Sequence, residues 1–265
     1  MAKHFNSKSS SKVPPPEGFR EAYTLHLADT ALILGHRNSE WCGHGPILEQ
    51  DIAISNISLD LIGQARNFYQ YAALLKADGS TEDTLAYFRD ANEFKNLLLA
   101  EQPKGDWAQT TLRQFFFSAY QYDLYDKLKE SSDHQLSAIA SKALKEVSYH
   151  LRWSSEWVIR LGDGTGESNK RMANAIESLW SYTDEMFNAA FFETSLIAEN
   201  IIPDISLLKE PWMKKVTEIF EEATLPVPRT SLVYTGGKIG QHTDHLSTIL
   251  EELQSVARAY PSATW

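Results

Sequence analysis

The chain has 265 residues, and 25 Lys and Arg against 35 Asp and Glu give it a formal net charge of −10. This negative charge opposes binding to phosphate backbones and to anionic lipid surfaces, so we expect neither a nucleic acid nor a membrane as a partner. A single cysteine excludes an internal disulfide, residues 1–30 lack a signal-peptide pattern, and no segment reaches the ~18 apolar residues of a membrane span, so we expect a cytoplasmic protein.

The N-terminal segment differs in composition from the rest of the chain. Residues 1–18 lack hydrophobic periodicity and contain three consecutive prolines, which predicts a disordered leader. Residues 19–265 contain neither a second polar linker nor a repeat of fixed period, so we expect a single domain there. Helical periodicity dominates this part, without sustained apolar–polar alternation or a hairpin signal, which predicts an all-α fold.

The first two predicted helices are long. The first is expected from about Arg20 to Glu40, because the glycines and the proline of residues 43–46 end it. The second is expected over residues 47–76. Its apolar residues fall on two stripes at helical spacing, Ile54, Ile57, Leu61, Phe68 and Tyr71 on one, and Leu48, Ile52, Leu59 and Ile62 on the other. Because a helix that is apolar on two sides is usually buried, we expect this one at the centre.

Six further helices follow from periodicity, caps and breakers. They are expected over about residues 80–103, 107–129, 132–161, 172–190, 212–225 and 241–260. Several predicted helices exceed 20 residues. This length is typical of a bundle of long antiparallel helices, here with additional C-terminal helices.

Polar side chains on otherwise apolar helix faces indicate where a bundle would hold a cofactor, because a buried polar group needs a partner. One such stripe lies on helix 47–76 and another on helix 132–161. Their members are Ala53, Asn56, Asp60, Gly63 and Asn67 on the first, and Ala143, Glu146, His150, Trp153 and Trp157 on the second. Asp123, among the aromatic residues of helix 107–129, is a third contributor to consider.

Spacing opposes a di-iron site. Such a bundle needs one carboxylate from each of two helices and a Glu-x-x-His pair from each of the other two. None of the eight histidines follows an Asp or Glu by three residues, and Gly63 and Tyr149 stand three residues after Asp60 and Glu146. His150 is turned by about 100° from the ligand position. We therefore expect Glu146 and His150 to form a hydrogen-bonded or ion-paired core element, and we assign no metal ligand, cofactor-binding residue or catalytic residue to this chain.

The segment from Gly236 to His245 has two motif-like features. Residues 235–240 resemble a phosphate-binding loop only loosely, because the P-loop spacing and a preceding strand are missing, so we expect a turn. His242 and His245 have a spacing that can hold zinc, but a third and a fourth ligand are missing, which favours a surface or interface role. Whether this segment contacts substrate or a partner protein stays open.

Four separated regions closely resemble, in order, the C subunits of bacterial phenylacetyl-CoA 1,2-epoxidase, a ring-oxygenating multicomponent monooxygenase. They are residues 39–75, residues 83–103, residues 143–153 with 160–168, and residues 234–246. The similarity extends from about Tyr23 to Trp265. The resemblance implies a ferritin-like helical fold and a subunit of the phenylacetate catabolic pathway.

The resemblance also implies a division of labour. The di-iron centre and the CoA-thioester site belong to a related A subunit, and the C subunit pairs with it as a non-catalytic structural subunit. A small B subunit and a reductase with flavin and an iron–sulfur cluster complete the system, which uses NADPH and dioxygen. A homodimer is a further possibility when the chain is alone.

Two alternatives remain at this stage. In the first, the chain is a catalytic di-iron oxygenase subunit with the unconventional ligands Asp60, Asp123, Glu146 and His150. Under the structural interpretation the same residues are relics of a duplicated metal site. In the second, the chain is an oligomeric helical binding protein unrelated to oxygenation. The stoichiometry, the helices that contact a partner and the aryl-CoA substrate of the complex do not follow from the sequence.

Overall fold

The computed structural model describes residues 17–229 and 232–263, and none of the elements in these residues is a strand. The helices, with the 3₁₀ helices named η, are α1 Glu17–Ser39, α2 Leu48–Lys76, α3 Glu82–Tyr87, η1 Ala91–Glu93, α4 Leu98–Glu101, α5 Trp107–Leu128, α6 His134–Gly162, α7 Gly166–Leu179, η2 Trp180–Tyr182, η3 Asp184–Phe187, α8 Phe191–Ala198, η4 Ile205–Leu208, α9 Lys209–Glu222, η5 Gly237–Ile239 and α10 Asp244–Ala259. The predicted all-α fold is confirmed. Residues 1–16 of the predicted leader 1–18 lie outside the described residues, whereas residues 17 and 18 begin α1, which corrects the end of the leader.

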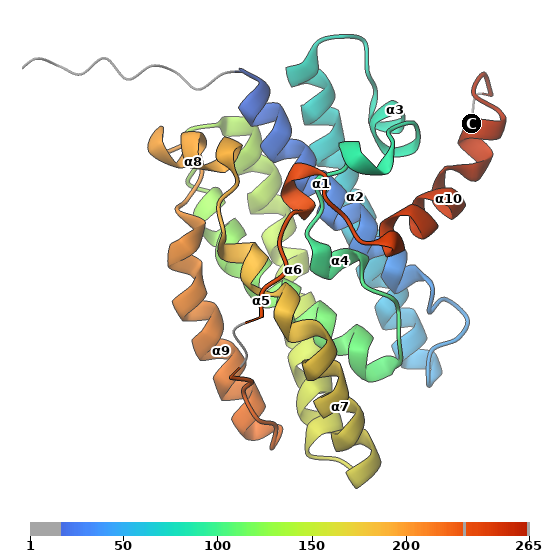
Figure 1. The fold of residues 1–265 in the computed structure, drawn as a ribbon, viewed down its shortest axis with the longest axis vertical. Helices are drawn as coiled ribbons and strands as arrows, with labels where there is room; N and C mark the ends of the chain where they lie inside the picture. Colours follow the sequence, from blue (N-terminus) through green and yellow to red (C-terminus); the bar gives the residue numbers. More distant parts are fainter. Residues whose placement is uncertain (1–16, 230–231, 264–265) are drawn as a thin grey trace, which may run out of the picture.

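Four long helices, α1, α2, α5 and α6, form the bundle (Figure 1). α1 packs along α2 and α5 packs along α6, and these are the most extensive helix pairs in the described structure. Side chains of Asp106 and Asp133 accept hydrogen bonds from the backbone N–H groups of the first turns of α5 and α6 and so begin these helices. The four bundle helices agree with the predicted helices 20–40, 47–76, 107–129 and 132–161 to within a few residues.

The buried side chains form a continuous core that reaches from α1 to α10. α5 is its most enclosed long helix, and the Phe116 ring on α5 contacts the rings of Trp180, Trp212 and Phe220. These contacts pack α9 and η2 against the bundle. No described helix combines the length and the apolar character needed to cross a membrane.

The single helix predicted over residues 80–103 is wrong. The structure has the short helices α3, η1 and α4 there, joined by extended backbone. Asp29 on α1 explains the break, because its buried carboxylate accepts hydrogen bonds from the Arg89 guanidinium and, at 2.8 Å, from the Lys95 backbone N–H. A continuous helix would not present both groups to one carboxylate. The helix predicted over 172–190 also differs, since α7 covers residues 166–179 and two 3₁₀ helices follow it.

α2 is not the central helix that its two apolar stripes predicted. Ile54, Ile57 and Leu61 are fully buried on one side of it. The second stripe points outward, and its residues Leu48 and Ile52 are exposed, as is Leu59. Periodicity identifies residues that share a side of a helix, whereas the neighbouring helices decide which side they cover.

Candidate functional site

α2 and α6 are joined by a polar cluster in the middle of the bundle, where the sequence placed its metal-site candidates. His150 on α6 is fully buried, and its Nε2 lies 2.9 Å from Oδ2 of Asp60 on α2. Glu146, one turn earlier on α6, accepts a hydrogen bond of 2.9 Å from Nε2 of Gln64 on α2. The expected hydrogen-bonded element is therefore present, and both of its residues have their partners on α2.

Two glutamines complete this cluster. Nε2 of Gln121 on α5 donates to Oε1 of Gln64 at 2.9 Å and to the Tyr125 hydroxyl at 3.0 Å. Both glutamine side chains are buried, so the amide groups cross-link α2, α5 and α6 in the interior. Neither residue was predicted from the sequence. Gln64 lies four residues after Asp60, on the same side of the helix, and this spacing could have identified Gln64 as a member of the cluster.

Asp123 does not join the cluster. It lies on α5, half-buried, with one carboxylate oxygen that has no hydrogen-bond partner among the described residues. Burial raises the pKa of the Asp123 carboxyl, and the charge of Lys215 on α9 opposes this shift. Asp123 follows Gln121 by two residues on α5 and is therefore turned by about 200° from the side of α5 that joins the cluster, whereas Asp60, Glu146 and His150 bond across α2 and α6. Of the four candidates, the structure gathers three.

The donor chemistry of the cluster differs from that of a di-iron site, which needs four carboxylates and two imidazoles. Here the carboxylates are those of Asp60 and Glu146, and the imidazole is that of His150. Amide groups of Gln64 and Gln121 stand between the helices, and an amide nitrogen that donates a hydrogen bond cannot coordinate a cation. Among residues 17–229 and 232–263, no group of three or more His, Cys, Asp or Glu side chains is arranged to hold a metal ion.

The segment Gly236–His245 is pinned to the bundle by buried carboxylates. Oε1 of Glu185, in η3, accepts hydrogen bonds from the backbone N–H groups of Gly236 and Gly237, at 2.9 and 2.8 Å. A Cβ on Gly237 would lie 2.2 Å from the backbone oxygen of Asn96, so this position requires glycine. The predicted turn is confirmed, and it binds a carboxylate of the same chain.

Two further residues of this segment carry buried charge. Nζ of Lys238 lies 2.9 Å from Oε2 of Glu193 on α8, and both side chains are buried. Nδ1 of His242 lies 2.8 Å from Oε2 of Glu101 on α4, and its Nε2 lies 2.9 Å from the Phe94 carbonyl oxygen. Both ring partners are acceptors, so both nitrogens donate, which requires the charged imidazolium. Burial disfavours this charge, but the hydrogen bond and the charge of Glu101 outweigh it and raise the pKa of His242.

His242 and His245 do not form a zinc site together. The ring nitrogens of His242 are both engaged, and its side chain is buried, whereas His245 is exposed. Within the chain, the segment Gly236–His245 joins α4, η3 and α8, and the expected surface or interface role stays a prediction.

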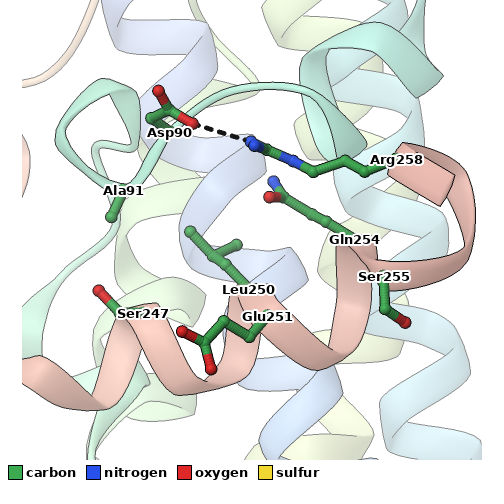
Figure 2. Close-up of a pocket in the computed structure, with 8 residues that line it drawn as sticks. All are labelled: Asp90, Ala91, Ser247, Leu250, Glu251, Gln254, Ser255 and Arg258. Carbon is green, nitrogen blue, oxygen red and sulfur yellow. Dashed lines mark hydrogen bonds and ion pairs between the residues drawn. The ribbon is translucent and has the colours of Figure 1, made fainter. Parts of the chain in front are cut away.

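A surface pocket of about 350 Å³ lies between α10 and η1, and Figure 2 shows the residues that line it. Its polar groups serve to attach α10. Arg258 forms an ion pair of 3.0 Å with Asp90, and Nε2 of Gln254 donates to the carbonyl oxygens of Ala86 and Arg89. The pocket therefore marks a packing contact of α10.

The comparisons with known proteins agree with this geometry. The sequence model of the family described as "Phenylacetic acid catabolic protein" matches residues 18–265. The chain is 49% identical over 244 residues to the C subunit of the 1,2-phenylacetyl-CoA epoxidase of Escherichia coli strain K12, an alignment that covers 92% of this chain and 98% of that protein. The resemblance found in the sequence and the ferritin-like helical fold that it implied are both confirmed. The chain belongs to the phenylacetic acid catabolic protein family.

Proposed function

We propose that this chain is a non-catalytic structural subunit of a phenylacetyl-CoA epoxidase, which pairs with a catalytic di-iron A subunit and supports it. The similarity to the C subunit of the E. coli epoxidase supports the assignment to such a complex. The observation that carries the structural role is the polar interior, in which Gln64 and Gln121 bond to each other where a di-iron bundle has metal-binding carboxylates.

The residues of this interior do not fit a di-iron centre. His150 uses Nε2 for Asp60, and Glu146 is bonded to the amide of Gln64. Asp123, which the catalytic alternative requires as a ligand, has no hydrogen bond to the described residues of the cluster and lies two residues after Gln121 on α5, about 200° around the helix. In this proposal the iron belongs to the A subunit, and the flavin and the iron–sulfur cluster belong to the reductase, which takes its electrons from NADPH.

The proposed work of this chain is to hold its partner rigid. Hydrogen bonds join α2 to α6 along most of their length, from Gln50 with Trp157, through Asp60 with His150, to Tyr71 with Asp133. Rigid support matters for catalysis, because a misplacement of about 1 Å can reduce a rate by about 10²-fold. We place the complex, with its small B subunit, in the cytoplasm, where CoA thioesters are metabolised.

Turnover tests this proposal. The A subunit, B subunit and reductase are assayed for epoxidation of phenylacetyl-CoA with and without this chain. We expect the chain to raise turnover by about tenfold or more, as rigid positioning contributes factors of this size. Equal turnover with and without it would contradict the proposal.

A variant separates the structural role from the catalytic alternative. Glu146→Gln keeps an oxygen that accepts the hydrogen bond from Gln64 but removes the carboxylate. We expect it to support turnover as well as the unchanged chain does. A loss of about 10²-fold or more, the size expected for a catalytic carboxylate, would favour the alternative.

A further inference from the structure

α2 exposes an unusual amount of apolar surface for a helix that faces outward. Leu48 is 72% exposed, Ile52 is 53% exposed and Leu59 is 66% exposed. The spacings of four and seven residues place these three side chains on one side of the helix. Gly63, four residues further, is exposed and continues the same line. We call Leu48, Ile52, Leu59 and Gly63 the α2 stripe.

α6 provides an internal comparison. Both helices have 29 residues and lie side by side, joined by the polar cluster. The outward residues of α6 are mostly polar or charged and include Lys142, Lys145, Arg152 and Glu156. This pattern is typical of a solvated helix. The apolar α2 stripe departs from it, and clustered apolar surface on a folded protein is typical of an interaction site.

Gly63 adds a second observation. A Cβ built at Gly63 would have no atom of the described residues within 4 Å, so packing among these residues does not explain why glycine stands there. Glycine in a helix interior costs about 1 kcal/mol relative to alanine. A glycine beside exposed leucine leaves a recess in the helix surface, into which a side chain of another helix can pack.

Charge indicates whether the α2 stripe binds a second copy of this chain or a different protein. Along the α2 stripe, α2 has the carboxylates of Glu49, Asp51 and Asp60, and Arg66, the first cation of the helix, lies 3.4 Å from the carboxylate of Glu82. A second copy would bring the same three carboxylates and a second net charge of −10 to this surface. A helix whose apolar face is flanked by Lys and Arg would complement both the apolar surface and the negative charge of this part of α2.

On this basis, and resting on the function proposed above, we propose that the α2 stripe is the surface that binds the catalytic A subunit. That partner provides an apolar helix face flanked by basic residues, which packs along Leu48, Ile52 and Leu59 and into the recess at Gly63.

Matched leucine variants test this proposal. Leu59→Arg places a cation in the stripe, and Leu207→Arg places one at a leucine that is 71% exposed in η4. Both changes are on the surface, so we expect unchanged circular dichroism and an unchanged midpoint of unfolding. The dissociation constant with the purified A subunit should rise by about 100-fold or more for Leu59→Arg, the size of a hot-spot loss, and stay unchanged for Leu207→Arg. Leu59→Glu should weaken binding less than Leu59→Arg.

Four results would overturn the proposal. The first is wild-type affinity of Leu59→Arg for the A subunit, and the second is an equal loss of affinity for Leu207→Arg. The third is greater weakening by Leu59→Glu than by Leu59→Arg, which would contradict a basic partner. The fourth is that Leu59→Arg dissociates a homodimer of this chain, seen by light scattering, while the mixed complex stays intact. Failure of the unchanged chain to bind the A subunit would instead contradict the proposed function, and this proposal with it.

Discussion

Lys238 and Glu193 form an ion pair that the surrounding core removes from water. Two buried charges are tolerated when each compensates the other and the remaining polar atoms are hydrogen-bonded. Lys238 also donates to the Asn188 carbonyl oxygen at 3.0 Å, and the Ala190 backbone N–H donates to Glu193. The pair therefore attaches the segment Gly236–His245 to α8, and each charge depends on the other.

Removing the cation alone should be costly. Lys238→Met leaves the Glu193 carboxylate buried without a counterion, and we expect a loss of about 3–5 kcal/mol in the free energy of unfolding, measured with urea. The double variant Lys238→Met with Glu193→Gln, which has no buried charge at this place, should recover part of the loss. A single variant within ~1 kcal/mol of the unchanged protein would show that the pair contributes little.

His242 should make stability depend on pH. Burial alone would lower the pKa of His242, but Glu101 raises it above its ordinary value. Because the folded pKa exceeds the unfolded one, the contribution is fully present below about pH 6.5 and is lost as pH rises through the folded pKa. Urea titrations between pH 6 and 9 should show that the stability advantage over His242→Gln shrinks as pH rises. A constant difference would contradict the charged imidazolium.

At the scale of elements, two glycines with opposite surroundings separate packing from helix propensity. Gly237→Ala would place a Cβ against the Asn96 carbonyl oxygen, and we expect a loss of about 1–3 kcal/mol or more from overpacking. Gly63→Ala meets open space in the middle of α2 and should gain about 0.5–1 kcal/mol. Thermal unfolding of both variants checks the prediction. A similar change in stability for the two variants would contradict the claim that the close approach of Gly237 to Asn96 requires glycine.

The sequence predicted the four bundle helices because each has a long, uninterrupted apolar period between clear breakers. It failed for residues 80–103, where the helix is broken by Asp29, a residue more than 50 positions earlier in the chain. Local propensity cannot register such a tertiary hydrogen bond. The outward direction of Leu48, Ile52 and Leu59 was missed for a related reason, since it depends on which neighbours cover α2.

The candidate site was predicted in part. The sequence identified Asp60, Glu146 and His150, because polar residues on an apolar helix face are conspicuous. Gln64 and Gln121 were missed, because glutamine is an ordinary helix residue and acquires its role only when three helices bring the amides together. Asp123 was considered as a third contributor because it lies among aromatic residues of α5, but Gln121, two residues earlier, is the α5 residue that bonds to the cluster.

At the scale of the whole molecule, the bundle is polar in its middle, where a di-iron protein binds metal, and apolar along the outward side of α2, where another protein can bind. In the middle of the bundle, hydrogen bonds among α2, α5 and α6 join Asp60 to His150, Gln64 to Glu146 and Gln64 to Gln121. The opposite side of α2 exposes apolar surface that residues 17–229 and 232–263 leave uncovered. Exposed apolar surface of this kind is typical of an interaction site, and the amide groups of Gln64 and Gln121 in the middle of the bundle differ from the carboxylate ligands of a di-iron centre.

Iron quantification in each chain tests the central claim most directly. This chain and the A subunit are co-expressed, purified as a complex, reconstituted anaerobically with ferrous iron, and separated for metal analysis. We expect iron in the A subunit and almost none in this chain. About two iron ions per copy of this chain, the content of a di-iron bundle, would contradict the structural role.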